Sequence, residues 1–173
     1  LQALEEEGIP SVVKGTGDLF GQDETMLIQA AFCRLADTDL HVNTADDYHV
    51  LDEGQTREYI REKIADLRDT GAIPTARTAE FLEWIAAKRE ELNRKERGEG
   101  SRRIYPQDIL HEMIAALGSQ DSPQAWPQQT LFNLGRVSKL ITQYEEVRPW
   151  VRPDELRSLC MFLGGWAAGT VDE

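Results

Sequence analysis

The sequence predicts a mainly α-helical domain preceded by a short helix–strand–turn segment. From residue 23 onward, apolar residues recur at the three- and four-residue spacing of amphipathic helices. Proline and glycine residues punctuate the ends of these periodic segments. Residues 1–22 show a different pattern, in which a short apolar run follows a glycine. We therefore expect a bundle of about six helices over residues 23–173, after a piece of an α/β domain over residues 1–22.

The opening segment has the order helix, strand, turn. Residues 1–7 are expected to end a helix, with Gly8 just after its last turn. Residues 9–13 are expected to form a strand, because a proline near the start of a strand costs no ladder hydrogen bond. Gly15 and Gly17 then predict a turn.

Helical periodicity begins after this turn. The first helix is predicted over residues 23–36. Residues 37–54 are polar and show no helical period, so they are predicted to form a long loop. A second helix is indicated by the apolar spacing over residues 59–67, and Gly71 and Pro74 are expected to close it.

Four more helices follow. Apolar spacing over residues 81–92 indicates the third, which runs into a charged stretch. Pro106 is placed to open the fourth helix, and Gly118 follows its last apolar residue. The fifth carries residues 131–144, and Pro153 opens the sixth.

Composition limits the classes of function. The 173 residues include 31 acidic and 19 basic residues, which gives a net charge of −12. This charge has the wrong sign for a domain that grips phosphates over a broad surface, so any nucleic-acid contact must be confined to a local basic patch. No apolar run approaches the roughly 20 residues that span a bilayer, and no signal-peptide pattern opens the chain. We expect a cytoplasmic protein without a membrane partner.

The two cysteines allow two interpretations. Cys33 and Cys160 lie far apart in sequence, each in an apolar helical context. They could form a disulfide or stay as two buried free thiols, and the free thiols fit a cytoplasmic protein better.

The chain starts at Leu1 without a methionine and ends at Glu173 with no helix stop. Both ends are therefore expected to be cut from a longer protein.

Motifs for nucleotide and metal binding fail on spacing. Gly15, Gly17 and Gly21 miss the GxGxxG pattern by one position, and there is no GxxxxGK[ST] loop. A calcium-loop-like stretch begins at Asp37 but has Val42 where glycine is needed and Tyr48 where glutamate is needed. The histidines and aspartates around it match no metal-ligand spacing; they are His41, Asp46, Asp47, His49 and Asp52. We expect no catalytic residue, metal or cofactor in this chain.

One stretch concentrates basic residues. It covers residues 88–103, contains glutamates as well, and is loosened by Gly98 and Gly100. Two interpretations stay open: a solvated helix end with a mobile loop, or a set of phosphate contacts on duplex DNA. Its candidate phosphate ligands are Arg94, Lys95, Arg97, Arg102 and Arg103, beside Arg89. The tryptophans are expected to pack between helices rather than stack on bases; they are Trp84, Trp126, Trp150 and Trp166.

Two stretches together resemble a known family. The first, LEEEGIPSVVKGTGDLF over residues 4–20 followed by Glu24, resembles the segment after the fourth motif of the UvrD/PcrA/Rep superfamily 1 DNA helicases, leading out of motor domain 2A. The second, FNLGRVSKLI over residues 132–141 followed by helical residues 156–163, is similar to the helices before the fifth motif, where the chain returns to 2A. Between them lies a helical stretch of about the length of a 2B insertion domain.

The resemblance implies a function for the longer protein. That protein would bind ATP and Mg²⁺, hydrolyse ATP between its 1A and 2A domains, and unwind DNA in the 3′ to 5′ direction during replication or repair. This chain would contain no ATPase residues. It would act as a 2B domain that rotates relative to its own motor domains. The nearest match to the glycine-rich turn through which such domains touch duplex DNA is residues 53–56, and it is poor.

The resemblance also places hinges. Gly15 and Gly17 would give backbone freedom at the first crossing between motor and insertion, and Gly165 would lie near the second. Phe20 would anchor the first helix against the strand.

Two other classes of function compete with this interpretation. One is an acidic helical module that docks on a basic partner, which the net charge of −12 favours. The other is a small enzyme that uses the histidine–aspartate loop.

Overall fold

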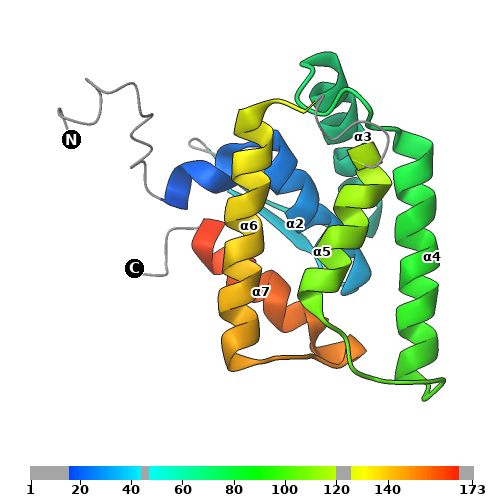
Figure 1. The fold of residues 1–173 in the computed structure, drawn as a ribbon. Coiled ribbons are helices and arrows are strands. Elements are labelled where there is room, and N and C mark those ends of the chain that lie inside the picture. The colour runs from blue at the N-terminus through cyan, green and yellow to red at the C-terminus, as the bar shows by residue number, and fades with distance from the viewer. Residues whose placement is uncertain (1–15, 44–46, 120–125, 168–173) are drawn as a thin grey trace.

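Residues 16–43, 47–119 and 126–167 are described by the computed structural model of the chain, and most of them are helical (Figure 1). Six α-helices and one two-stranded antiparallel hairpin form this part of the chain, with short 3-10 and π turns between them. The predicted fold class, a mainly helical bundle, is confirmed.

The elements follow one another in simple order. A 3-10 helix, η1, comes first and the long helix α4 lies in the middle of the chain. The bounds are η1 Thr16–Gly21, α2 Asp23–Leu35, β1 Leu40–Asn43, β2 Tyr48–Leu51, α3 Glu53–Asp69, α4 Thr78–Glu96, α5 Pro106–Ile114, η2 Ala115–Ser119, α6 Gln128–Val147, η4 Pro153–Glu155 and α7 Leu156–Ala167.

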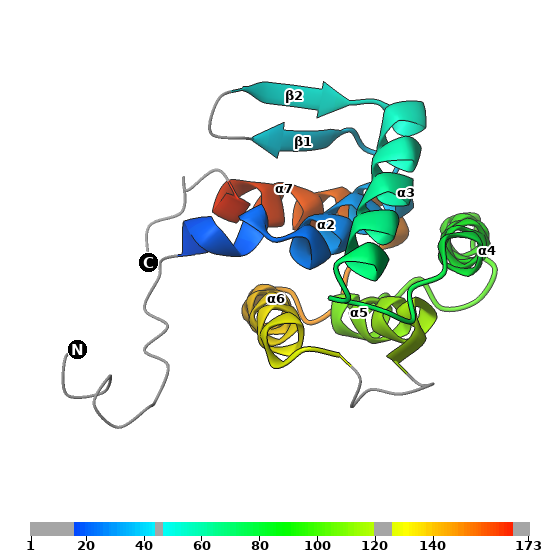
Figure 2. The ribbon, with the colours of Figure 1, turned by 90° about the horizontal axis from the view of Figure 1, so that it is seen from above.

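Helix α2 forms the centre of the core. It contacts α3, α4, α6, α7 and η1, and Figure 2 shows it lying between α7 on one side and α6 on the other. Leu27, Ile28 and Phe32 are fully buried, as are Ala30 and Ala31 on the same helix. A helix that is apolar on nearly every side is one that other helices surround. Its small alanines let those neighbours approach closely.

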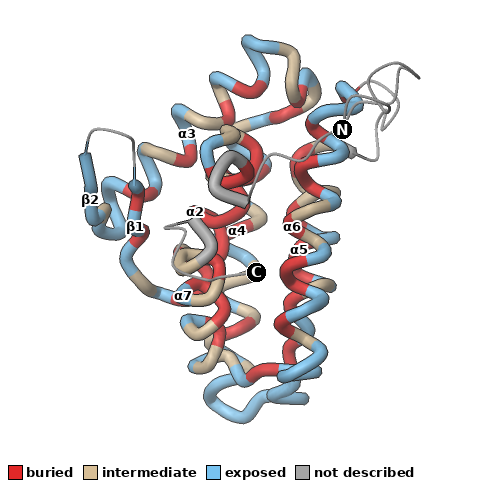
Figure 3. The backbone as a smooth tube through the Cα atoms, turned by 90° about the vertical axis from the view of Figure 1, so that its left-hand side faces the viewer, coloured by how far each residue is buried: buried red, intermediate tan, exposed pale blue. Residues whose placement is uncertain are grey.

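The prediction of a long loop over residues 37–54 is wrong. This stretch contains the β1–β2 hairpin, in which Leu40 pairs with Leu51 and Asn43 with Tyr48. In β1 buried and exposed residues alternate, but β2 is exposed over most of its length (Figure 3). Each strand has only four residues, and most of β2 is exposed to solvent. The alternation of apolar and polar residues is therefore too short and too weak to identify a strand from the sequence.

Helix α3 also begins earlier than its apolar spacing indicates. The Asp52 side chain accepts a hydrogen bond from the Gln55 backbone, and the Gln55 side chain accepts one from the Asp52 backbone. This reciprocal capping satisfies two backbone donors and starts the helix at Glu53. Gly71 follows the end of the helix with a φ of 76°, as expected for a closing glycine.

The predicted third to sixth helices are all present. Pro106 stands in the first turn of α5, as predicted. Gly118 has a φ of 91°, and a Cβ there would lie 2.8 Å from the Thr75 hydroxyl oxygen, so both backbone shape and space require glycine. Pro153 opens the short turn η4, which leads into α7.

The predicted helix and strand over residues 1–13, together with Gly15, lie outside the described residues. Thr16 and Gly17 belong to η1, where the sequence predicts a turn. Leu19 and Phe20 are buried, and their 3-10 helix packs against α2 and α7. In the part of the chain that the structure describes, no helix combines the length and apolarity needed to cross a bilayer.

Candidate functional site

A backbone bridge brings two distant arginine-bearing segments together at one end of the bundle. Ile104 follows the loop after α4, and Val151 follows α6. The backbone N–H of each donates to the carbonyl of the other at 2.9 Å. Both side chains are buried, so the bridge is anchored in the core. Arg102 and Arg103 therefore lie beside the RPWVRP stretch of residues 148–153.

Left-handed glycines make this approach possible. Gly98 and Gly100 have φ values of 93° and 95°, a region that other residues rarely adopt. They turn the chain back after α4 and lead it to the bridge at Ile104. The two glycines that were expected to loosen the basic stretch thus shape its reversal.

Aromatic rings accompany the arginines. The Arg103 guanidinium lies over the Trp150 ring, 5.2 Å from its centroid. Trp150 is 39% exposed and Tyr105 44% exposed. We refer to this region as the basic end; its members are Arg102, Arg103, Tyr105, Arg148, Trp150 and Arg152.

The arginines of the basic end have no carboxylate partner in the part of the chain that the structure describes. Within residues 16–43, 47–119 and 126–167, no ion pair involves any of these four arginines, and all four are exposed. Guanidinium groups that remain available, next to an exposed indole and phenol, suit phosphate contact and base stacking.

The predicted phosphate ligands divide into two groups. Lys95 pairs with Glu91 at 2.8 Å, and Arg97 pairs with Glu90 at 3.2 Å. Arg94 lies on α4 near these residues, exposed and outside the ion pairs found in the described residues. The second group, Arg102 and Arg103, belongs to the basic end.

Sequence reasoning missed most of the basic end. The members that were not predicted as site residues are Tyr105, Arg148, Trp150 and Arg152. The available signal was local: a tryptophan between two arginine–proline pairs directly after a helix. Interleaved basic and aromatic residues are typical of single-strand and phosphate binding. The pairing with Arg103 could not be read from the sequence, because it depends on the bridge.

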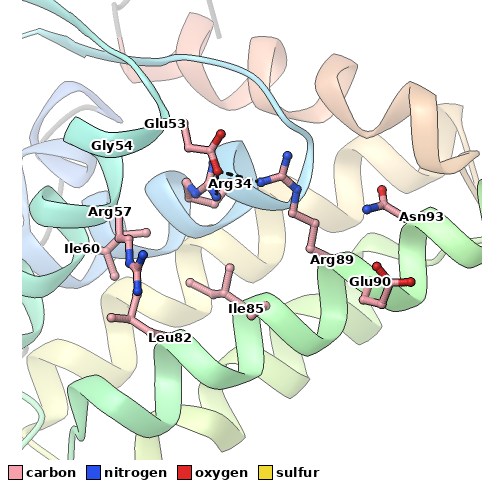
Figure 4. Close-up of a pocket in the computed structure, with 11 residues that line it drawn as sticks. Arg34, Glu53, Gly54, Arg57, Ile60, Leu82, Ile85, Arg89, Glu90 and Asn93 are labelled. Atoms are coloured by element: carbon pink, nitrogen blue, oxygen red, sulfur yellow. Dashed lines mark hydrogen bonds and ion pairs between the residues drawn. The ribbon is translucent and has the colours of Figure 1, made fainter.

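A second arginine-rich region lines a pocket of about 390 Å³ between the end of α2, the start of α3 and α4 (Figure 4). Arg34 donates to the Glu53 carboxylate at 2.7 Å. Arg89 donates to Glu53 at 3.2 Å and to Asp37 at 2.6 Å. We refer to this region as the arginine pocket.

The carboxylates in the arginine pocket already satisfy its buried guanidinium groups. Hydrogen bonding and charge from Arg34, followed by those from Arg89, hold the pKa of Glu53 below its usual value. The Arg34 side chain is only 13% exposed and that of Arg89 24%. Arg57 approaches the apolar wall formed by Ile60 and Leu82 in Figure 4. The pocket is thus an ion-pair network that joins three helices.

The predicted hinge residues have different surroundings. Gly15 lies outside the described residues, whereas Gly17 is in η1. Phe20 is 6% exposed and belongs to η1, which packs against α2 and α7. The strand that was expected beside it lies outside the described residues. Gly165 lies within helix α7, which continues through it to Ala167.

The tryptophans and histidines also have defined partners. Trp84 stacks on Phe81 with ring centroids 5.8 Å apart, and Trp126 is buried, so the packing role predicted for these two is confirmed. Trp150 is the exception, and the Trp166 side chain lies outside the described residues. His41 is hydrogen-bonded to Tyr48, and His49 lies 3.3 Å from Asp47. Among described residues no three histidine, cysteine or acidic side chains gather as a metal site, and Asp46 is not described.

Comparison with known proteins adds no neighbour to this description. No protein-family model matches the sequence, and neither the curated proteins nor the solved structures contain a match.

Proposed function

We propose that this chain is the helical 2B-like insertion domain of a cytoplasmic UvrD-like DNA helicase, together with the edge of motor domain 2A over residues 1–22. The proposal begins from the two stretches that resemble the flanks of such an insertion. A mainly helical body between those stretches agrees with it.

The observation that supports it best is the meeting of the first and last described elements. Helix η1 packs against α7, and both pack against α2. The Thr25 hydroxyl donates to the Leu19 carbonyl at 2.5 Å and so ties η1 to α2. Leu19 and Leu163 are buried in the same core. A chain that begins and ends its helical body at one place is suited to insertion in a host domain, which it must leave and rejoin.

In this proposal the longer protein supplies the chemistry. Its motor domains bind ATP and Mg²⁺ and move along single-stranded DNA. This domain orients the duplex and regulates the motor by rotating about its two connections. The basic end gives it a DNA contact of limited area, with arginines on phosphates and Trp150 on an exposed base. A local contact suits a chain of net charge −12.

The experiment is a hinge substitution in the full-length helicase. Gly15→Val restricts the backbone at the proposed first crossing, so unwinding of a duplex should fall several-fold more than DNA-stimulated ATP hydrolysis. Gly135→Val is the matched control, because Gly135 is exposed on α6 and a Cβ there meets nothing within 4 Å. Equal losses of unwinding and ATPase in Gly15→Val would contradict the hinge assignment.

A second candidate function rests on the net charge. An acidic helical module would bind a basic protein through its acidic residues, and the basic end would take no part in that binding. The two candidates differ in a simple binding measurement. The helicase domain binds DNA through the basic end at low salt, whereas the docking module does not bind DNA.

A further inference from the structure

Cys33 and Cys160, far apart in the sequence, meet across the α2–α7 interface. Cys33 lies near the end of α2 and Cys160 in α7, and these helices pack together. Both cysteines are free and buried, with 3% and 6% of their surface exposed. This confirms the expectation of two buried free thiols. What the sequence does not indicate is that both line one pocket.

The pocket connects the two thiols with the surface. Its volume is about 320 Å³, and it lies between α2, α7 and the β1–β2 hairpin. Tyr48 of the hairpin and Met161 of α7 line it and are 57% and 75% exposed. A small polar molecule can therefore reach the thiols although the cysteines themselves are buried.

The two thiols interact with each other. The neighbouring Cys33 side chain and, after it, burial hold the pKa of the Cys160 thiol well above its usual range. Because the thiolate is the nucleophile in thiol chemistry, the reaction begins at whichever of the two cysteines loses its proton.

We propose that Cys33 and Cys160 form a dithiol modification site, which a small two-electron oxidant such as hydrogen peroxide converts into a disulfide between α2 and α7. The proposal does not depend on the helicase assignment, because it rests on the geometry of the two helices and their pocket.

The reaction has two steps. The thiolate of one cysteine attacks a peroxide oxygen, the O–O bond breaks, and hydroxide leaves, so that this cysteine becomes a sulfenic acid. The sulfur of the second cysteine then attacks the first sulfur; the S–S bond forms, the S–O bond breaks, and the departing oxygen leaves as water with the proton of the second thiol. In sum, two thiols lose two electrons and two protons, and peroxide becomes two waters.

The test uses the reduced protein and hydrogen peroxide. After the excess peroxide is removed, the intact mass should be lower by two hydrogens, and a non-reducing peptide map should show the Cys33 and Cys160 peptides joined. Dithiothreitol should reverse both changes. The cross-link closes a long loop, so the midpoint of thermal unfolding should rise by roughly 5–10 °C. The proposal is overturned if both cysteines remain open to alkylation after unfolding, or if oxygen is added only to Met161.

Single-cysteine variants test the sulfenic acid step. Cys160→Ser and Cys33→Ser each leave one cysteine, and dimedone should trap its sulfenic acid without an internal cross-link. A mass lower by two hydrogens after peroxide treatment of either variant would overturn the assigned pair. The wild-type measurement stands on its own if either variant folds poorly.

The route through the pocket has its own control pair. Tyr48→Ala removes an exposed wall of the pocket and should speed disulfide formation several-fold. Val50→Ala truncates an exposed residue of the same strand that is not among the pocket-lining residues, and should leave the rate unchanged. Equal rates in the wild type and both variants would show that the oxidant enters by unfolding rather than through the pocket.

Discussion

Arg103 of the basic end and Arg89 of the arginine pocket have contrasting surroundings. Arg103 lies over an exposed indole ring, and no carboxylate pairs with it in the described part of the chain. Arg89 is three-quarters buried and donates to two carboxylates, on Asp37 and Glu53. Both guanidinium groups carry the same charge, but only the first is free to bind a phosphate.

This contrast shows that a count of basic residues does not locate an anion-binding surface. Arginines held by carboxylates fasten helices to one another, and an incoming phosphate would have to displace those carboxylates first. Arginines without such partners lose only hydration when they bind. Each of the following predictions tests that division of roles.

The largest expected effect is on DNA binding. The double substitution Arg102→Ala and Arg103→Ala should weaken binding of a fluorescent DNA about tenfold or more at low salt, and should reduce the salt dependence by roughly two phosphate contacts. Fluorescence anisotropy over a series of salt concentrations measures both quantities. Arg89→Ala is the control from the arginine pocket and should leave the affinity nearly unchanged. A loss in Arg89→Ala equal to that in the double variant would abolish the contrast.

The next effect is on stability, and here the larger change is expected in the arginine pocket rather than in the basic end. Arg34→Ala should lower the free energy of unfolding by about 1–2 kcal/mol, because it removes a largely buried side chain and one of the partners of Glu53. Denaturant titration measures this change. Arg103→Ala should change the same free energy by less than about 0.5 kcal/mol. The comparison breaks down if Arg103→Ala proves as damaging as Arg34→Ala.

The smallest effect is on the pH dependence of stability. Because the folded state holds the pKa of Glu53 below its usual value of 4.5, this carboxylate contributes stability that is fully present above that value. The contribution is lost as the pH falls through the lower, folded-state pKa. The difference in unfolding free energy between the wild type and Glu53→Gln should therefore shrink below about pH 4.5.

A matched substitution checks the origin of this pH dependence. Glu83 is exposed on α4 and takes part in no ion pair within the described residues. The difference between the wild type and Glu83→Gln should stay flat over the same pH range. A parallel slope in both variants would mean that general charge repulsion, rather than the arginine pocket, causes the effect.

The sequence predicted the fold better than the site. Helices can be predicted from the local spacing of apolar residues and from residues that start or end a helix, such as Pro106 and Gly118. Their order was therefore predictable. The hairpin was missed because β1 and β2 are four residues each and β2 is exposed. Short strands depend on pairing with a partner strand, and that pairing is not a local property.

The basic end shows the same limit. Arg102 and Arg103 could be found from charge alone. Their neighbours after α6 could not, because it is the bridge between Ile104 and Val151 that brings them close. The sequence already held a reason against assigning Lys95 as a phosphate ligand. Glu91 stands four residues before it on a predicted helix, at the spacing of a stabilising ion pair.

Helix α6 separates two tryptophans with contrasting environments. Trp126 stands just before its first turn, buried, with its indole N–H donating to Thr75 at 3.1 Å, whereas Trp150 follows its last turn and is exposed. Twenty helical residues span roughly 30 Å, so the two indoles report on separate ends of the molecule. Their intrinsic fluorescence should differ in colour and in quenching by iodide. Once Trp84 and Trp166 are replaced by phenylalanine, Trp126 would report unfolding at one end, and Trp150 would report the proposed binding of DNA at the other.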